Sequence, residues 1–348
     1  MAKKTILGID IGYDQLKLAL VSGGEVVSTA MEQMPENLLK EGRFTSPELM
    51  ASLIRDTMND NGMKASLAAV VLPNELVYVK TVDMPKMSEE QLSYNLPFEF
   101  NDYITGEIKD YLFDYAVLKK DDENDLGGFS VPAESVEAGE ETEETMHLMA
   151  VGVERAVVED IQIMLRKASL KLVKTAPALS AYISLLRETQ IGLDNGRDEY
   201  AILDIGYHNI TMYMFKHDQH IATREFEVGL QSLEDIIADK YGVEKHLAHT
   251  YVMSNFENCL ESEECLNFYD NISVEMERAI NFYEFSNQGS NLADLWICGG
   301  GAVNEPLLRS IYETLDLDLH PSYELLPGGR DIENYNSYVQ AIGVTLEL

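Results

Sequence analysis

The sequence predicts an α/β protein of two related halves, with a small inserted subdomain in the first half. Three observations support this prediction. A strand–turn–strand pattern occurs twice, strand and helix patterns alternate along the chain, and a third glycine-rich turn follows a late strand. The 348 residues suffice for about two domains, and 45% hydrophobic with 25% charged residues is an ordinary globular balance.

The first half alternates between strand and helix patterns. Ser46 followed by Pro47, and Ser88 with Gln91 three residues later, are typical helix starts. We expect strands at 4–11, 16–21, 67–72, 76–82, 111–118, 146–153 and 171–175, and helices at 47–62, 88–100, 154–169 and 177–190.

Residues 121–144 hold ten acidic and no basic residues. Such a segment cannot bury enough apolar surface to offset its ordering entropy, so we expect a flexible acidic loop inside a hairpin. Its deletion should leave folding intact.

The second half repeats the pattern with a longer helical part. A strand–turn–strand pattern spans 201–215, and further strands are expected at 221–227 and 294–298. Helical patterns follow; they cover 232–286, 303–314 and a last helix near 337–347.

Charge narrows the range of partners. With 60 acidic and 26 basic residues the net charge is −34, and it remains −24 without the acidic loop. Nucleic acid and an anionic membrane surface would be repelled. The acidity favours a basic peptide or protein surface, or it serves solubility alone. No apolar run reaches the roughly 18 residues of a membrane span, and the first residues are typical of a strand rather than a signal peptide.

The cysteines and histidines give no strong metal signal. Cys259, Cys265 and Cys298 are odd in number and lack framework spacing, which favours reduced thiols in the cytoplasm. Two histidine pairs have a spacing of three, but no CxxC accompanies them, so ordinary surface histidines are favoured over zinc ligands. These histidines are His217, His220, His246 and His249.

The repeated pattern carries the main functional signal. Residues 7–21 and 201–215 each contain Asp-Ile-Gly-Tyr between two strands. Gly12 and Gly206 permit tight turns whose exposed backbone N–H groups can cradle phosphate. Asp10 and Asp204, at strand ends, could hold Mg²⁺ through waters. The alternative is two ordinary hairpins with glycine turns.

The third glycine turn follows the strand DLWIC. Gly299, Gly300 and Gly301 let a ligand approach the backbone, and the helix that follows presents its N-terminus to an anion or polar group.

In this order and spacing, the motifs resemble those of the actin/Hsp70/sugar-kinase superfamily of ATPases. GIDIGYDQLKLALV and LDIGYHNITMYMF resemble its two phosphate motifs, and ICGGGAVNEPLL resembles its adenosine motif. TAPALSAYISLL and SYVQAIGVTLEL resemble its connecting helices, with Gly343 at a close helix crossing. The resemblance implies an actin-like ATPase fold with two ribonuclease-H-like halves.

The resemblance also implies a domain division. The first half would span 1–198, with its core at 1–83 and 171–198 and the inserted subdomain at 84–170. The second half would span 199–348, with its core at 199–231 and 291–336 and a small subdomain at 232–290. The last helix, 337–348, would pack back on the first half.

Within this superfamily, VDMPKMSEEQL and LMAVGVERAVVEDIQIMLRKASLKLV resemble the PilM branch, the cytoplasmic actin-like proteins of type IV pilus assembly. The related FtsA proteins continue into an amphipathic membrane helix, which we do not expect in this protein. The resemblance implies a cytoplasmic scaffold that binds the N-terminal peptide of a PilN-like bitopic membrane protein and reaches the membrane only through it. The peptide would contact Val79, Val82, Met84 and Met87.

The same resemblance implies an ATP site with Mg²⁺ held through water by Asp10 and Asp204. The nucleotide-binding residues would be Asp10, Gly12, Tyr13, Asp14, Gln15, Lys17, Asp204, Gly206, Tyr207, His208, Asn209, Thr211, Gly229, Gly299, Gly300 and Gly301. Lys17 would contact phosphate, or it would be a solvated strand lysine.

Departures from the superfamily pattern predict weak binding and slow or absent turnover. KTAPALSAY lacks the Asp, Glu or Gln that orients the attacking water in hydrolysing members. Leu230 replaces a second glycine, and His249 and Val252 replace the residues near the ribose. The remaining alternatives are a filament-forming actin-like ATPase in cell division or plasmid segregation and, less favoured, a carbohydrate kinase.

Overall fold

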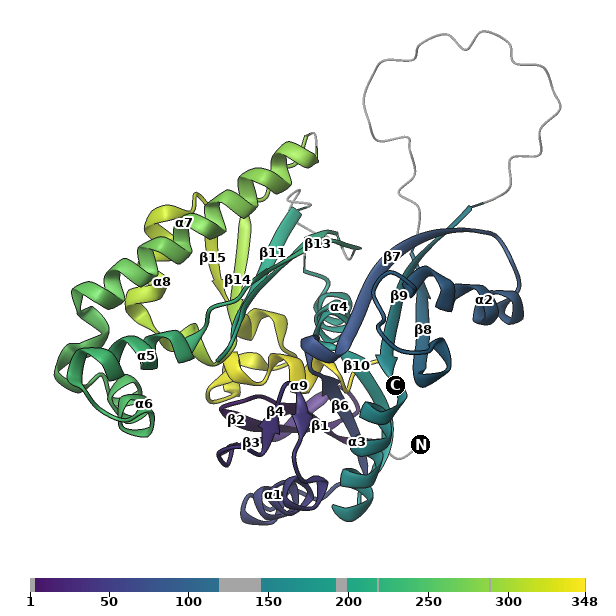
Figure 1. Ribbon diagram of the computed structural model, residues 1–348, viewed down its shortest axis with the longest axis horizontal. Helices are drawn as coiled ribbons and strands as arrows, with labels where there is room; N and C mark the ends of the chain where they lie inside the picture. The colour runs from purple at the N-terminus through teal and green to yellow at the C-terminus, as the bar shows by residue number, and fades with distance from the viewer. Residues whose placement is uncertain (1–3, 119–144, 192–198, 218, 288, 348) are drawn as a thin grey trace, which may run out of the picture. The chain divides into compact units, whose positions relative to one another are not determined.

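The computed structural model describes residues 4–118, 145–191, 199–217, 219–287 and 289–347 (Figure 1). The contacts within the chain define two compact units. We call residues 1–73 and 162–348 the main unit, and residues 74–161 the inserted unit. The acidic loop expected at 121–144 lies outside the described residues.

The first sheet of the main unit begins with the predicted hairpin. Three strands form an antiparallel meander and two more join it in parallel, in the order β10-β6-β1-β2-β3. Every residue of the β1 strand except Thr5 is buried, as expected for a strand between two covered faces. The strands are β1 (Thr5–Ile11), β2 (Gln15–Ser22), β3 (Glu25–Gln33), β6 (Leu67–Leu72) and β10 (Lys171–Pro177).

The second sheet repeats this arrangement in the second half of the chain. Its order is β13-β12-β11-β14-β15, again with an antiparallel meander and two added parallel strands. The repeat predicted from the two Asp-Ile-Gly-Tyr motifs is therefore a repeat of whole sheets. The strands are β11 (Glu199–Ile205), β12 (Ile210–Lys216), β13 (Gln219–Phe226), β14 (Asp294–Cys298) and β15 (Asp318–Pro321).

Local sequence signals explain where the helices begin. The Ser46 hydroxyl accepts the Leu49 N–H at the start of α1 (Pro47–Asp60). The Asn304 side chain accepts the Leu307 N–H at 3.0 Å, so α8 (Glu305–Thr314) begins two residues later than predicted. The other long helices of the main unit are α4 (Ala178–Thr189), α5 (Leu230–Tyr241), α6 (Lys245–Ser254) and α7 (Glu263–Ser286).

Two helical stretches predicted in the second half differ most clearly from the structure. The stretch at 232–286 is broken at Gly242 and Asn255, which both adopt left-handed backbone angles. The last helix, expected at 337–347, is only α9 (Val339–Gly343). The Thr345 hydroxyl donates to the Ile342 carbonyl at 2.7 Å, and such a side-chain bond competes with helix continuation.

The α4 and α9 helices cross at very short range on one face of the first sheet. A Cβ atom added to Gly343 would lie 2.4 Å from the Ala181 carbonyl oxygen of α4. A Cβ atom on Gly8 of β1 would lie 1.7 Å from the Ala341 carbonyl oxygen. The small residue predicted at Gly343 is thus required by the packing of α9 against α4, and Gly8 is required by the packing of α9 against β1.

The described residues of the inserted unit form a three-stranded antiparallel sheet, an α-helix and the first residues of a second α-helix. The strands β7 (Val77–Pro85), β9 (Thr145–Glu154) and β8 (Tyr111–Val117) lie in that order. The predicted capping box at Ser88 and Gln91 starts α2 (Glu89–Asn95), and Pro97 converts the rest of the predicted helix into a 3₁₀ turn. The unit ends within α3 (Arg155–Lys167), whose last residues belong to the main unit.

Candidate functional site

The two Asp-Ile-Gly-Tyr turns have the same geometry. Asp10 pairs with Lys17 across the β1–β2 hairpin, and Asp204 pairs with Thr211 at the equivalent place in β11–β12. The Gly12 N–H donates to the Gln15 carbonyl and the Gly206 N–H to the Asn209 carbonyl, both at 3.0 Å. The two glycine N–H groups therefore close their own turns, which leaves only the other backbone N–H groups of each turn for a phosphate.

Glycine is nevertheless needed at the second turn. A Cβ atom on Gly206 would lie 2.7 Å from the Asn209 carbonyl oxygen, whereas the equivalent distance at Gly12 is 3.1 Å. The Asn209 side chain donates to Glu225, and the Asp14 carboxylate accepts from the Gln33 amide at 2.7 Å. Asp14 and Gln15 lie at the tip of the first hairpin. Asn209, which is equivalent to Gln15, lies at the tip of the second.

A buried ammonium group joins the two halves of the site. Lys17 Nζ lies 3.1 Å from Asp10 Oδ2, and the side chains are only 15% and 12% exposed. Burial alone would lower the pKa of Lys17, but the charges of Asp10 and then Asp204 outweigh it and raise the pKa above its ordinary value. The alternative of a solvated Lys17 is wrong, since its ammonium forms an ion pair with Asp10 and is also attracted by the charge of Asp204.

Asp204 lies in a network that sequence reasoning missed. Burial raises the pKa of the Asp204 carboxyl, and Lys17 opposes that rise. The Gln340 amide of α9 donates to Asp204 and to the Tyr182 hydroxyl of α4. Tyr182 contacts Cys298 Sγ at 3.3 Å, and burial raises the pKa of both groups. The sequence feature that could have indicated this network is Gln340, a polar residue in the otherwise apolar α9 helix.

Two aromatic rings bridge the turns. Tyr13 of the first turn stacks on His208 of the second, with ring centroids 3.9 Å apart. The Tyr13 hydroxyl also accepts the Gly42 N–H at 2.7 Å, which fixes its ring. The residues that replace the usual small polar side chains of the superfamily therefore contact each other.

The Gly-Gly-Gly segment packs closely against the second turn. Gly299 has a φ of 89°, and a Cβ atom there would lie 2.4 Å from both Asp204 Oδ1 and the Ile205 carbonyl oxygen. At Gly301 the added atom would lie 2.2 Å from the Ile205 side chain, but at Gly300 its nearest neighbour is Leu230 at 3.9 Å. Gly300 alone among the three leaves open space for a ligand beside the backbone.

The start of α5 is also tied to the second turn. Gly229 is required there, because a Cβ atom would lie 2.4 Å from the Tyr207 carbonyl oxygen. The Leu230 and Gln231 N–H groups donate to the Gly206 and Tyr207 carbonyls. These N-terminal donors are thus used within the protein.

A polar cluster on α5 and α6 contacts residues of both turns. The buried Glu234 accepts from the Tyr207 hydroxyl at 2.6 Å and pairs with His249 at 2.7 Å. His249 Nδ1 also lies 3.9 Å from Asp14 Oδ1. Burial is the largest cause that raises the pKa of Tyr207 above its ordinary value, and the hydrogen bond to Glu234 is the second. Sequence reasoning selected Tyr207, Asp14 and His249 but missed Glu234, the residue that connects them.

The four predicted peptide contacts do not share one surface. Side chains alternate along β7, so Val82 and Met84 point into the core of the inserted unit and are 4% and 5% exposed. Val79 lies on the opposite face and is 37% exposed. Met87 packs against the core, with its sulfur 3.6 Å from the Asn95 amide.

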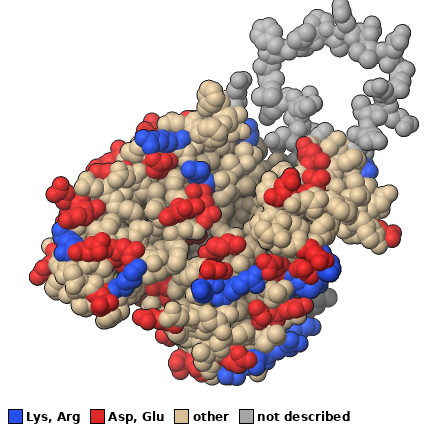
Figure 2. All heavy atoms as spheres, in the orientation of Figure 1, with Lys and Arg blue, Asp and Glu red and all other residues tan. Residues whose placement is uncertain are grey.

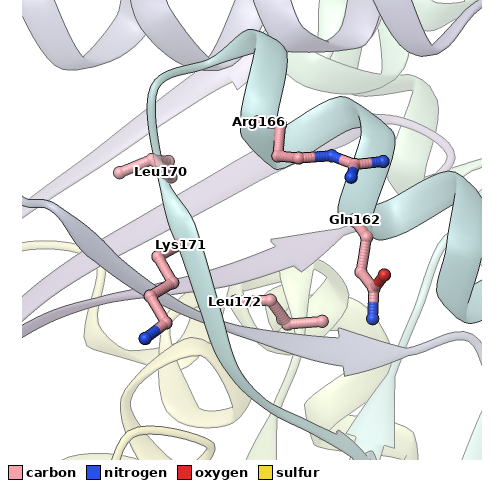
Figure 3. A pocket seen from close by; sticks show the side chains of 5 residues that line it. All are labelled: Gln162, Arg166, Leu170, Lys171 and Leu172. Atoms are coloured by element: carbon pink, nitrogen blue, oxygen red, sulfur yellow. The ribbon is translucent and has the colours of Figure 1, made fainter.

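A separate pocket of about 270 Å³ lies in the main unit, at the end of α3 (Figure 3). Gln162 and Arg166 project from one side of the helix, and Leu172 of β10 lies below them in the figure. The pocket is lined by Gln162, Arg166, Leu170, Lys171 and Leu172. None of these residues belongs to the predicted nucleotide site.

Two kinds of feature are absent from the described part of the chain. Within the ranges that the structure describes, no three His, Cys, Asp or Glu side chains are grouped as a metal site would require. In the same part of the chain, no helix is both long and apolar enough to cross a membrane.

Two sheets of matching topology, joined through paired Asp-Ile-Gly turns and crossing helices, define an actin-like ATPase fold. Known structures with this fold superimpose on nearly the whole chain. MreB5 of Spiroplasma citri bound to AMPPNP gives a TM-score of 0.51 at 10% identity, over 98% of this chain and 95% of that one. The ethanolamine utilization protein EutJ from Carboxydothermus hydrogenoformans gives 0.60 at 13% identity, over 99% and 90%.

The sequence then narrows the class to one family. The model of the type IV pilus assembly protein PilM family matches residues 8–321, so the chain belongs to that family. The structure of a PilM-PilN type IV pilus biogenesis complex is similar, with a TM-score of 0.78 at 21% identity over 97% of both chains. The PilM branch predicted from the sequence is confirmed.

Proposed function

We propose that this protein is a cytoplasmic scaffold of a type IV pilus or related secretion machine. It binds the cytoplasmic N-terminal peptide of a PilN-like bitopic membrane protein and lies at the inner face of the membrane through that partner. Membership of the PilM family carries this proposal, and the similarity to a PilM-PilN complex supports the choice of partner. The charge of −34 suits a peptide that precedes a membrane span, since such segments are usually basic.

Within the inserted unit, the β7 strand offers the peptide a surface on one face only. Val79 is accessible to a ligand, whereas Val82 and Met84 hold the strand against its own core. Apolar residues of the peptide would supply most of the affinity, and its charges mostly the association rate.

The experiment is a titration of the protein with a fluorescent peptide that carries apolar residues followed by basic ones. We expect Val79→Asp to weaken binding about tenfold or more, because the peptide would bury a charge where it would otherwise bury an apolar side chain. Val27→Asp is the matched control, since Val27 is 60% exposed on β3. Equal effects of the two substitutions would exclude this face, and crosslinks confined to 232–290 would contradict any peptide site in the first half.

For the nucleotide site we propose weak binding of ATP with Mg²⁺ and slow turnover. Asp10 and Asp204 are oxygen donors of the kind that Mg²⁺ prefers, and Lys17 is placed to neutralise phosphate. The Tyr13–His208 stack opposes binding, because a phosphate between the turns would have to separate the rings. Calorimetric titration with Mg-ATP and phosphate-release kinetics test this; turnover near about 1–10³ per second would overturn it.

A further inference from the structure

One stretch of this acidic chain lacks acidic residues altogether. Residues 161–187 include five basic and no acidic side chains, whereas the whole chain has 60 acidic residues in 348. Two of the five point toward the C-terminus, where Lys174 donates to the Leu346 carbonyl and Arg187 pairs with Glu347. The other three, Arg166, Lys167 and Lys171, lie at the end of α3 and the start of β10.

The neighbouring α1 helix adds to this group. The Arg55 guanidinium donates to the Lys167 carbonyl at 2.9 Å, which places it against the end of α3. The Lys171 N–H donates to the Ser66 carbonyl, two residues after the exposed Lys64. We call the resulting surface the cationic face; it comprises Arg55, Lys64, Arg166, Lys167 and Lys171. Figure 2 shows blue atoms gathered along the lower right edge of the molecule, where α3 lies in Figure 1.

Counter-charges neutralise this face only in part. Glu48 of α1 pairs with Lys167 at 2.9 Å, and the bond lowers the pKa of Glu48. Asp56 and Asp60 are the other acidic residues of α1. Among the residues that the structure describes, the exposed side chains of Arg166 and Lys171 have no hydrogen bond or ion pair. These two cations border the pocket of about 270 Å³, whose wall includes Leu170 and Leu172 (Figure 3).

We infer that the cationic face binds the anionic headgroups of a phospholipid bilayer. The inference rests on the proposed function, because a partner that spans the membrane brings this protein within reach of the lipid. With a net charge of −34, the chain is attracted to such a surface only where cations are locally concentrated. The exposed Leu49 of α1, beside Glu48 and 63% exposed, supplies an apolar side chain at the same interface.

The proposed contact is weak by itself. A juxtaposed Lys or Arg contributes roughly fivefold to partitioning onto an anionic bilayer, and the effect decays within a Debye length of about 10 Å. The membrane partner therefore remains the anchor. The cationic face sets which side of the scaffold faces the lipid.

Vesicle co-sedimentation of the full chain, without any partner, tests the inference. The probes are vesicles of POPC alone and of POPC with an equal amount of POPG, at 50 and 300 mM KCl. We expect binding only to the anionic vesicles and only at low salt. Lys171→Glu and Arg166→Glu should each reduce that binding about fivefold or more, and Arg309→Glu, an exposed reversal on α8, should not.

Several outcomes would overturn the inference. They are no sedimentation with anionic vesicles at 50 mM KCl, equal binding to POPC, or equal losses with Arg309→Glu and Lys171→Glu. Binding of duplex RNA or polyglutamate through the same residues, without vesicle binding, would assign the face to another partner. Thermal melting of each variant is the control, because an unchanged Tm shows that reduced vesicle binding does not come from a folding defect. Since no peptide is present, failure here leaves the peptide titration of the proposed function unaffected, and the reverse also holds.

Discussion

Replacing Lys17 with methionine is the sharpest test of the candidate site. The substitution keeps a long unbranched side chain but removes the ammonium that lies 3.1 Å from Asp10 and faces Asp204. At an effective dielectric constant of about 20, one such ion pair has a Coulomb energy of about 5 kcal/mol before desolvation is counted. Removing one partner of a buried pair costs about 3–5 kcal/mol, because the other charge stays buried without compensation.

The slight exposure of both side chains favours the lower end of that range. For a cooperative unit of about 260 residues, with an unfolding entropy of about 2.1 cal/mol/K per residue, a loss of about 3 kcal/mol lowers the Tm by about 5–6 °C. Thermal melting followed by circular dichroism measures this. Lys64→Met is the matched control, since an exposed lysine should change stability by less than about 0.5 kcal/mol.

The pH dependence separates a charge effect from a packing effect. Burial already raises the pKa of Asp204 while Lys17 opposes the rise, so the variant should raise it further. An acidic group whose pKa is higher in the folded than in the unfolded state stabilises the protein at low pH. That stabilisation is lost as the pH rises from the unfolded-state pKa, about 3.9, through the folded-state pKa. The Tm difference between wild type and variant should therefore be larger at pH 8 than at pH 5. A difference below about 2 °C, or one that is equal at both pH values, would refute the ion-pair argument.

Three further changes test other parts of the structure. Gly343→Ala should cost about 1–3 kcal/mol by forcing α9 away from Ala181, as measured by urea unfolding; an unchanged midpoint would contradict the close crossing. His208→Ala removes the stack on Tyr13 and should tighten Mg-ATP binding up to about tenfold by calorimetry, whereas weaker binding would show that the ring helps to hold the ligand. Burial lowers the pKa of His220 to about 4, so stability should fall as pH drops from about 6.5 toward 4, and His220→Asn should recover about 1–2 kcal/mol of the loss at pH 5; equal acid sensitivity of both proteins would contradict this.

Local patterns were enough to predict the hairpins, the repeated turns and the helix starts. Each depends on residues within a few positions, such as Ser88 with Gln91 or the glycine of each Asp-Ile-Gly turn. The β3 strand was missed because it lies at the sheet edge and only Ala30 is fully buried, so its apolar pattern is weak. The short β15 strand, which ends in Pro321, was missed because four residues carry too little pattern.

The site network could not be predicted, because its partners are far apart in sequence. Tyr182 contacts Cys298, 116 residues away, and Gln340 reaches Asp204 across 136 residues. No local spacing encodes such pairs. The burial of Val82 and Met84 could have been predicted, since side-chain alternation along a strand places them on the face opposite Val79.

Lys17 decides whether the cluster that it forms with Asp10 and Asp204 binds a ligand or is only structural. A bound phosphate would have to attract Lys17 away from Asp10, and the two aspartates alone would repel it. A ligand that binds only the folded state raises stability in proportion to the logarithm of its concentration over Kd. Excess Mg-ATP should therefore raise the Tm of the wild type but not that of Lys17→Met. An equal rise in both proteins would show that the nucleotide's phosphates bind away from these turns, and no rise in either would indicate that the network is purely structural.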